Sequence, residues 1–413
     1  MTARTLADRL ASVRAERPVP VVVPPPAPRE NRSEALARWF GAQLAIEPGG
    51  AAVVVERTVQ LPPEVAARLA DLPSACYFDT ETTGLSTGAG TVVFLAGMGR
   101  LDGDRLVVRQ WVLPDYHHEP ALLRRVASEL AACARIVTYN GRGFDLPLLV
   151  TRLTIHGLFR ELAALPEQHD DLLPVARRLF RRPLGGARLA VVEAGILGVR
   201  RESDCPGSEV PGRYFSYLRG GSPDLLADVL DHNLQDIVSL ALLEAEVLRL
   251  RDGGWRDATM LDRHGMAREL LRAGATDEAV ALAETAIEPA LDPAEAHALR
   301  RLATRLLLAS GEVDRAEALW SGATRRASCD AATAWLEVAR IRERHRGDLV
   351  GALEAALTAS RVLDLAFALG RGGGMLTIGR VRLRVEARLR RLRRWVAAAE
   401  RRRHRAAGAR AVA

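Results

Sequence analysis

The stretch Phe78-Asp79-Thr80-Glu81-Thr82-Thr83-Gly84 follows an apolar run that begins at Ala75, and it ends at a glycine turn. Alternate side chains of an extended chain point to the same face, so Asp79 and Glu81 leave the strand together. Two carboxylates this close repel each other unless a cation lies between them. Because Mg²⁺ and Mn²⁺ prefer hard oxygen ligands, the stretch predicts a metal site at the end of a buried strand.

Two later segments supply further carboxylates. The first, residues 139–145, consists of a strand end, a glycine turn and then Asp145 at the start of a helix. The second places His232 and Asp236 four residues apart on one face of a predicted helix. Each signal alone is modest, because an aspartate at a helix start usually caps it and a helical aspartate is usually solvated. Their order behind Asp79 and Glu81 is what carries weight.

Strand-like and helical patterns alternate from residue 75 onward. The predicted strands span residues 75–79, 91–101, 106–113 and 135–139, and the predicted helices span 121–134, 146–156, 171–180, 188–197 and 223–251. Three sequential antiparallel strands followed by alternating helices and strands predict an α/β domain, with a mixed sheet covered by helices.

Beyond Gly254 the strand signals end and an internal repeat appears. Blocks that begin at Gly274, Gly311 and Gly347 each combine a glycine, an acidic residue and a small alanine, at offsets of 37 and 36 residues. Such a period predicts an all-α array of helical hairpins. The array weakly resembles tetratricopeptide repeats, because most aromatic positions of that consensus are absent.

The chain therefore divides into four expected parts. Residues 1–50, with their Pro-rich run, are expected to be weakly ordered. The other parts are an α/β domain over 51–252, helical repeats over 253–370 and a basic C-terminal helix or tail over 371–413. This division suits the length of 413 residues, which is too great for one continuous core.

Charge is distributed unevenly. All 58 basic residues are arginine, and the net charge is +7. Residues 375–413 hold 13 arginines and two glutamates, so this tail carries +11 and leaves −4 for the rest. Two interpretations of the tail stay open: a helix that caps the array with a solvated basic face, or a contact with nucleic-acid phosphates.

Composition excludes several classes of protein. An apolar fraction of 48% with 26% charged residues is typical of globular proteins and excludes disorder of the whole chain. The four cysteines lie at no zinc-ligand spacing and form no disulfide framework, so isolated buried thiols are expected. No apolar run reaches the length of a spanning helix or of a secretory leader. We expect a cytoplasmic protein without a membrane partner.

Four segments resemble one known family in the same order. They are residues 78–85, 139–149, 206–211 and 232–240, and they are similar to the YprB-type ribonuclease-H-like domain, a bacterial branch of the DEDD exonuclease superfamily. The likeness covers about residues 70–251. Helical repeats are a common companion of that domain.

The resemblance implies a two-metal phosphodiesterase of the 3′-5′ exonuclease type. Asp79, Glu81, Asp145 and Asp236 would hold two Mg²⁺ or Mn²⁺ ions about 3.5–4 Å apart. His232 would be the candidate base, since imidazole titrates near neutral pH. The familiar branches have a tyrosine with three residues between it and the last aspartate, or a histidine with four residues between them, whereas His232 has three and so takes the tyrosine spacing. One residue turns a helix by about 100°, so a base and a hydrogen-bonding role both stay open.

Lesser candidates surround these residues. Thr83, Leu85, Asn140 and Phe144 are candidate substrate contacts, with packing or turn formation as the alternatives. Asp171 is either an outer carboxylate or the cap of the helix that follows it. Tyr214, Phe215 and Tyr217 are considered as a stacking platform for single-stranded bases.

Two functions from different classes compete. The first is a metal-dependent exonuclease that acts on a single-stranded DNA or RNA end, with the repeats as a possible docking platform for a protein partner. The second is a catalytically weak or inactive nucleic-acid-binding or scaffold protein that uses the repeats and the arginine-rich tail. The sequence does not distinguish DNA from RNA, or exonuclease from endonuclease cleavage.

Overall fold

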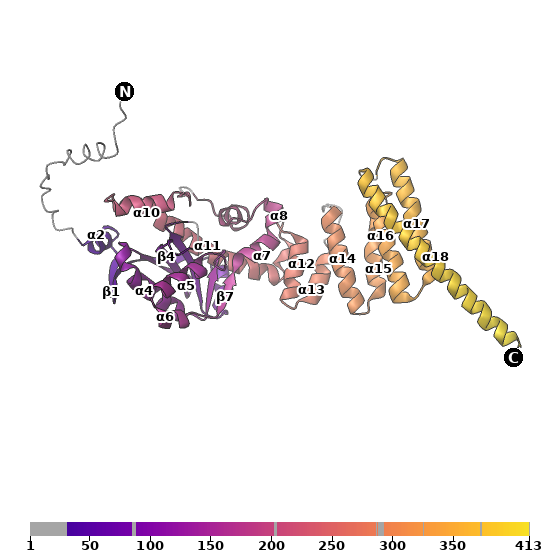
Figure 1. Cartoon of the computed structure of the whole chain (residues 1–413), viewed down its shortest axis with the longest axis horizontal. Helices are drawn as coiled ribbons and strands as arrows, with labels where there is room; N and C mark the ends of the chain where they lie inside the picture. The colour runs from indigo at the N-terminus through magenta and orange to yellow at the C-terminus, as the bar shows by residue number, and fades with distance from the viewer. Residues whose placement is uncertain are drawn as a thin grey trace, which may run out of the picture.

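The structure is a computed structural model, and it describes residues 31–84, 88–201, 205–285, 287, 293–324, 326–371 and 374–412. A sheet with its covering helices forms one end of an elongated molecule, and a row of helices runs from it to the C-terminus (Figure 1). The predicted α/β domain with an all-α array is confirmed.

The sheet has seven strands in the order β1-β2-β5-β4-β3-β6-β7. Their bounds are β1 Gln43–Glu47, β2 Gly50–Gln60, β3 Ala75–Thr82, β4 Val93–Asp102, β5 Arg105–Val112, β6 Arg135–Thr138 and β7 Gln168–Asp171. The pairs from β1 through β3 are antiparallel, whereas β3, β6 and β7 run parallel. The parallel part brings the carboxyl ends of β3 and β6 to one edge, which is where the candidate residues lie.

Alternation along β3 divides the interior into two cores. Cys76 and Phe78 belong to one core, whereas Tyr77 belongs to the other. Asp79 and Glu81 follow the parity of Tyr77 and so leave the sheet on that second side. Their common face agrees with the expectation from the sequence.

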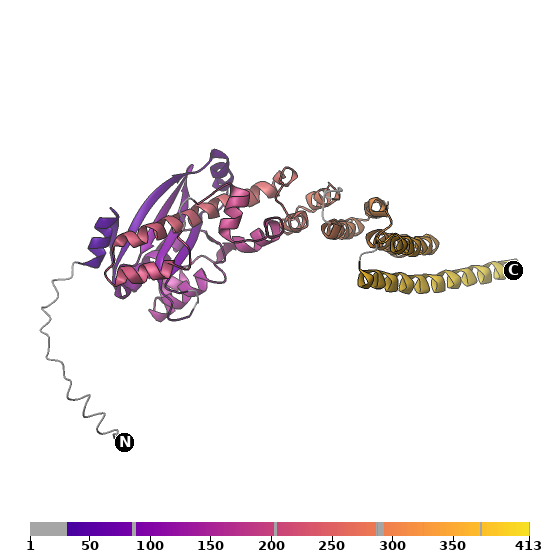
Figure 2. The ribbon, with the colours of Figure 1, turned by 90° about the horizontal axis from the view of Figure 1, so that it is seen from above.

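Helices cover both faces of the sheet. The first core lies under α4 Glu119–Ala131 and α5 Asp145–Ile155, whereas α3 Pro63–Ala70, α7 Leu172–Leu179 and the long α11 Ala227–Arg251 pack in the second core. Figure 2 shows α11 lying along the strands. The remaining short elements of this region are α2 Arg32–Trp39, η1 Tyr116–His118, α6 Phe159–Ala163, α8 Arg181–Leu184, α9 Leu189–Val192, η2 Glu193–Leu197, α10 Val210–Leu218, η3 Pro223–Leu226 and η4 Gly254–Arg256.

One expectation about the first 50 residues is wrong for the part that the structure describes. Residues 32–47 form α2 and β1, and β2 begins at Gly50. Leu36 of α2 is fully buried, and β1 pairs with β2 along its whole length. These short elements gain their stability from the core and from an adjacent strand, which local sequence does not reveal. The Pro-rich run at 18–28 lies outside the described residues.

The C-terminal half is an array of antiparallel helices. They are α12 Arg263–Arg272, α13 Thr276–Thr285, α14 Pro293–Ala309, α15 Val313–Ser321, α16 Cys329–Ile341, α17 Leu349–Ala368 and α18 Met375–Val412, with the turns η5 Gly322–Thr324 and η6 Arg342–Arg346. Gly274, Gly311 and Gly347 all have positive φ, at 80°, 84° and 66°, and each ends one helix. The repeat of helical hairpins is thus observed, and its likeness to tetratricopeptide repeats stays a resemblance.

The array is packed directly on the α/β region. The second core continues from α11 through Met266 of α12 to Leu299 of α14. At Gly265 an added Cβ would lie 1.9 Å from the carbonyl oxygen of Arg178, so only glycine lets α12 approach α7 this closely. The carboxylate of Glu269, whose side chain is 3% exposed, bonds Arg178 and Arg251 across the junction. The two regions are therefore held together by shared packing and buried ion pairs.

The basic C-terminal segment forms α18, whose apolar face closes the array. Val385, Leu389 and Leu392 are buried in the third core. Arg388 and Arg391 both bond Glu343, which is also buried. The capping interpretation is observed for this part of the tail. Within the described part of the chain, no helix combines the length and apolarity that crossing a membrane requires.

Candidate active site

Asp79 and Glu81 stand on β3 beside a β-bulge. The pairing of β3 with β4 shifts register between Glu81 and Thr82, where a bulge changes the direction of side chains. The side chain of Glu81 is 13% exposed, and Asp79 is half-buried. Both carboxylates thus lie toward the carboxyl end of β3, with limited access to water.

A hydrogen-bond relay holds Asp79 in place. Nδ2 of Asn233 donates to Oδ2 of Asp79 at 2.9 Å, and Nε2 of Gln110 donates to Oδ1 of Asn233 at 3.0 Å. The space for Asn233 exists because Gly97 lies opposite Asp79, and a Cβ at Gly97 would meet Oδ1 of Asn233 at 2.0 Å. None of these three positioning residues was identified from the sequence.

Asp145 begins α5 and turns back toward β3. Its Oδ1 accepts hydrogen bonds from the backbone N–H of Thr80 at 3.1 Å and from the hydroxyl of Thr80 at 2.5 Å. The residue is 4% exposed. Burial raises the pKa of Asp145 to about 6, and the bonds from Thr80 oppose this rise. Asp145 is the first residue of α5, and its side chain bonds β3, so its role is not limited to capping its own helix.

Asp236 lies on α11 within an ion network that the sequence did not predict. Its Oδ1 accepts a hydrogen bond from Nη2 of Arg201. The same guanidinium bonds both oxygens of Glu193 at 2.7 Å, and Ser239 donates to Glu193 as well. Burial raises the pKa of Asp236, while His232 and Arg201 lower it. Arg201 could not be found from the sequence because it sits 35 residues from Asp236, in a segment without a motif.

The imidazole of His232 lies between carboxylates. Its Nε2 is 3.8 Å from Oε1 of Glu81 and 3.8 Å from Oδ2 of Asp236. Its Nδ1 lies 3.0 Å from Nη1 of Arg201. Because arginine only donates, Nδ1 is the acceptor, and the neutral ring then carries its proton on Nε2. In this arrangement His232 faces the carboxylates as a donor, which favours the hydrogen-bonding role over the base.

The four acidic side chains share one electrostatic environment. Burial raises the pKa of Asp79 well above its usual range, and the carboxylates of Asp236, Asp145 and Glu81 raise it further. Repulsion of this kind requires that the groups lie close together. The four predicted carboxylates therefore lie within electrostatic range of one another.

The donor set fits hard divalent cations in type and charge. Every candidate ligand is a carboxylate, and a cation between them would relieve the repulsion around Asp79. Within the described residues, however, no three His, Cys, Asp or Glu side chains already surround one point as metal ligands. Hydrogen bonds from Asn233, Thr80 and Arg201 occupy one oxygen of Asp79, Asp145 and Asp236, respectively. Closing a ligand shell thus requires these side chains to adjust.

The candidate substrate contacts lie in different structural settings. The hydroxyl of Thr83 accepts the backbone N–H of Val92 at 2.9 Å, so it closes the β3–β4 connection. Asn140 is exposed and has a positive φ of 71°, as expected for its turn role. Phe144 is half-buried immediately before α5. Leu85 lies outside the described residues.

Two further expectations are resolved by contacts. Asp171 caps α7 by accepting the N–H of Leu173, and it also accepts the N–H of Asn140. Capping is therefore observed. The prediction of a stacking platform is wrong, because Tyr214 and Tyr217 lie in α10 and are 0% and 4% exposed. Tyr214 stacks on Phe94 within the core, with ring centroids 4.2 Å apart.

The cysteines are buried and reduced, but two of them are not isolated. The thiols of Cys76 and Cys133 lie close enough to shift each other's pKa, whereas isolated thiols were expected. The neighbouring thiol of Cys76, against the effect of burial, lowers the pKa of Cys133 to about 7. The pair forms because β3 and the start of β6 are adjacent in the sheet, a contact that sequence spacing does not show.

Comparison with known proteins agrees with this geometry. Residues 76–248 match a family described as the RNase_H superfamily. A protein of Bacillus subtilis (strain 168), described as "Uncharacterized protein YprB", is 38% identical over 219 residues. The aligned part is 52% of this chain and 52% of that protein, so the chain spans about half the length of the relative it matches. Residues 76–248 are therefore similar to the ribonuclease-H-like superfamily, and a helical array follows them in this chain.

Proposed function

We propose that the chain is a metal-dependent nuclease that hydrolyses phosphodiester bonds at single-stranded nucleic-acid ends. The carrying observation is the cluster of Asp79, Glu81, Asp145 and Asp236, in which three carboxylates raise the pKa of the fourth. The ribonuclease-H-like domain supports a nuclease-type chemistry. The 3′-5′ exonuclease polarity is part of the proposal and follows from the resemblance of the four segments.

Asp79, Glu81, Asp145 and Asp236 are the residues that would hold two Mg²⁺ or Mn²⁺ ions. Such ions, when bound, supply charge stabilisation at the phosphate and a more acidic water. The chain itself orients the ligands: Asn233 fixes one oxygen of Asp79, and Thr80 fixes one oxygen of Asp145. Thr83, Asn140 and Phe144 are proposed to border the substrate.

The contact between His232 and Arg201 fixes which ring nitrogen of His232 carries the proton. With Arg201 donating to Nδ1, the Nε2–H of His232 faces Glu81 and Asp236, 3.8 Å from an oxygen of each. A base role would require Nε2 to be free of its proton, and so would require Arg201 to leave Nδ1. We therefore propose that His232 positions the carboxylates.

A second function, nucleic-acid binding with weak or absent cleavage, is favoured by one contact. Arg201 already bonds Asp236, so a cationic side chain occupies part of the position that a metal would take. In this alternative the array and the arginine-rich tail bind nucleic acid, and the carboxylate cluster is vestigial.

The deciding experiment is Mn²⁺-dependent release of mononucleotides from end-labelled single-stranded DNA and RNA. Wild type is expected to release them, whereas Asp79→Asn, which keeps the shape of the side chain, is expected to be inactive. Asp231→Asn is the matched control, because Asp231 lies on α11 with a side chain that is 64% exposed. Equal slow release by wild type and Asp79→Asn would leave only the binding function.

A further inference from the structure

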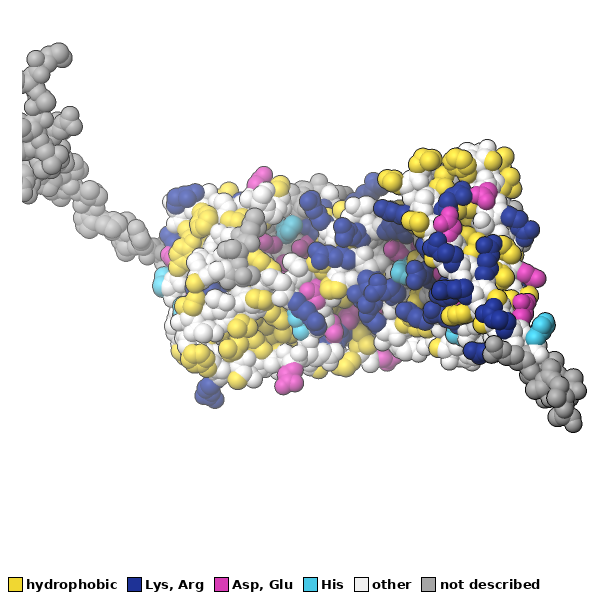
Figure 3. Space-filling view, turned by 45° about the vertical axis from the view of Figure 1, so that its right-hand side comes forward, with side chains coloured by type: hydrophobic (Ala, Val, Ile, Leu, Met, Phe, Trp, Pro, Cys, Tyr) yellow, Lys and Arg dark blue, Asp and Glu magenta, His cyan; other side chains and the backbone are white. Residues whose placement is uncertain are grey.

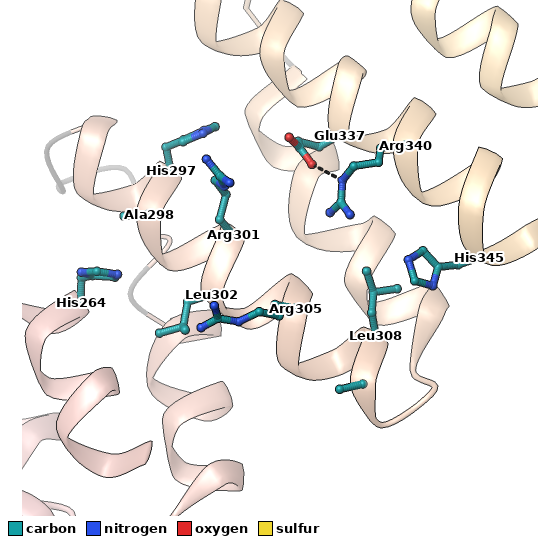
Figure 4. Close-up of a pocket in the computed structure, with 11 residues that line it drawn as sticks. His264, His297, Ala298, Arg301, Leu302, Arg305, Leu308, Glu337, Arg340 and His345 are labelled. Carbon is teal, nitrogen blue, oxygen red and sulfur yellow. Dashed lines mark hydrogen bonds and ion pairs between the residues drawn. The ribbon is translucent and has the colours of Figure 1, made fainter. Parts of the chain in front are cut away.

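A concave hollow of about 800 Å³ opens on the helical array and contains none of the carboxylate cluster. Its wall is formed by α12, α14, α16 and the turn η6 (Figure 4). The polar side chains that face it are basic with one exception, and they include His264, His297, Arg301, Arg305, Arg340 and His345. The hollow is therefore a candidate site for an anion.

Two arginines give the hollow its charge. Arg301 and Arg305 are exposed, four residues apart on α14, and both lie on the wall of the hollow in Figure 4. Within the part of the chain that the structure describes, neither guanidinium forms an ion pair or a side-chain hydrogen bond. Two like charges on one helical face repel each other, so a bound anion would stabilise this arrangement.

High arginine content alone does not explain this pair. Several other arginines of the array are matched to acids: Arg315 bonds Glu284 and Glu312. Arg342 bonds Glu317 in the same way, at 2.8 Å. Arg301 and Arg305 differ from these residues in having no acidic partner.

The rest of the lining also suits a polyanion. The single acidic residue, Glu337, already accepts a hydrogen bond from Nε of Arg340 at 2.7 Å. Leu302 and Leu308 provide apolar surface. Burial and the charge of Arg301 lower the pKa of His297, which agrees with a positive local field.

The basic surface continues past the hollow. A second hollow of about 260 Å³ lies between α16 and α18 and shares Glu337 with the first. It is lined by Arg384 and by Arg388 and Arg391, which also pair with Glu343. Figure 3 shows arginine side chains gathered over this part of the array. Two adjoining basic hollows form a strip, and a strip fits an extended chain of charges better than a single small anion.

We propose that this strip binds the sugar–phosphate backbone of a single-stranded nucleic acid, with Arg301 and Arg305 contacting phosphates. The choice of nucleic acid as the polyanion rests on the proposed function. Because α12 shares a core with α11 and is joined to it by Glu269, the strip keeps a fixed orientation to the carboxylate cluster. The array thus guides the strand, and backbone contacts leave binding tolerant of sequence.

The test measures binding without cleavage. Fluorescence anisotropy of a labelled dT or U oligonucleotide is recorded in chelator with full-length Asp79→Asn protein, over a series of salt concentrations. Adding Arg301→Ala/Arg305→Ala is expected to weaken binding by at least about tenfold, and to lower the slope of log K against log salt by about 1.4. That slope change corresponds to about 0.7 for each lost phosphate contact on a single strand.

Two companion variants make the result specific. Arg301→Lys/Arg305→Lys keeps both charges and is expected to keep most of the salt slope. Arg105→Ala/Arg361→Ala removes the same charge from two exposed arginines of β5 and α17 that line neither hollow, and it is expected to change the slope little. An equal loss of salt slope in this control would show that net charge determines binding, and it would contradict the proposed strip.

Other outcomes are equally decisive. No binding, an unchanged slope in the Arg301/Arg305 variant, or displacement of the oligonucleotide by poly-glutamate of equal charge at equal concentration would overturn the inference. The proposed nuclease activity is scored separately, with wild type and Mn²⁺. If the strip binds but wild type releases nothing, the nuclease proposal fails and the strip stands. If wild type cleaves but the salt slope of the Arg301/Arg305 variant is unchanged, the strip proposal fails and the nuclease proposal stands.

Discussion

The α/β region from β1 to α11 and the helical array from α12 to α18 place ionised side chains in different settings. Around Asp79 the charges have limited access to water, and Asp79, Asp145 and Asp236 are each held by a donor: Asn233, Thr80 or Arg201. Around Arg301 and Arg305 the charges are exposed in a concave surface, and among the described residues neither guanidinium forms an ion pair. A buried charge is costly unless it has a partner, whereas an exposed charge is solvated by water and is available to a ligand. The two regions thus suggest two tasks, reaction and capture.

The largest expected effect tests the buried side of this comparison. Asp145→Asn should lower cleavage by on the order of 10³-fold or more, because it removes a proposed metal ligand while keeping side-chain volume. Single-turnover cleavage with Mn²⁺ measures the change. Asp231→Asn, at an exposed position of α11, is the control and should retain most activity. Full activity of Asp145→Asn would remove Asp145 from the proposed cluster.

The next effect concerns the ion network. Arg201→Ala should reduce the free energy of unfolding by about 3 kcal/mol, because it leaves the 1%-exposed carboxylate of Glu193 without its cation. Chemical denaturation measures it. Arg57→Ala breaks an exposed pair with Asp231 and should cost about 0–1 kcal/mol. Adding Glu193→Gln to Arg201→Ala should restore part of the loss, and absence of any rescue would contradict the explanation.

A smaller effect is expected at the glycine beneath Asn233. Gly97→Ala should destabilise the fold by about 1–3 kcal/mol, since its Cβ would meet Oδ1 of Asn233 at 2.0 Å. Displacing Asn233 also releases Asp79, so cleavage should fall with stability. Gly212→Ala in α10, where a Cβ meets nothing within 4 Å, should change stability by less than about 1 kcal/mol in the favourable direction.

The smallest effect lies at the junction of the two regions and depends on pH. Burial favours the neutral form of Glu269, but hydrogen bonds from Arg251 and Arg178 outweigh it and lower the pKa of this carboxyl. A lowered pKa in the folded state contributes stability that is present above the ordinary pKa and is lost as pH falls through the folded value. The stability difference between wild type and Glu269→Gln should therefore shrink in acid. A difference that is constant from pH 7 to pH 3 would contradict this coupling.

Particular residues show why sequence succeeded in some places and failed in others. The strand at Ala75 and the repeat glycines at 274, 311 and 347 were predictable, because alternation and periodic glycines are local signals. The helix α2 and strand β1 were missed, since a short segment becomes ordered through its neighbours. Tyr214 was considered for a stacking platform because composition does not reveal the ring of Phe94 beneath it.

The sequence by itself determined the identity and order of the four acidic residues, because a strand and a helix impose fixed spacings on the side chains of one face. It also determined the presence of helical hairpins. Only the tertiary structure decided that Arg201 joins Asp236 to Glu193, that Gly97 makes room for Asn233, and that two arginines of α14 line a hollow without an ion pair to any described residue. Such contacts join residues that are distant in the chain, and packing of α11, α14 and the sheet brings them together.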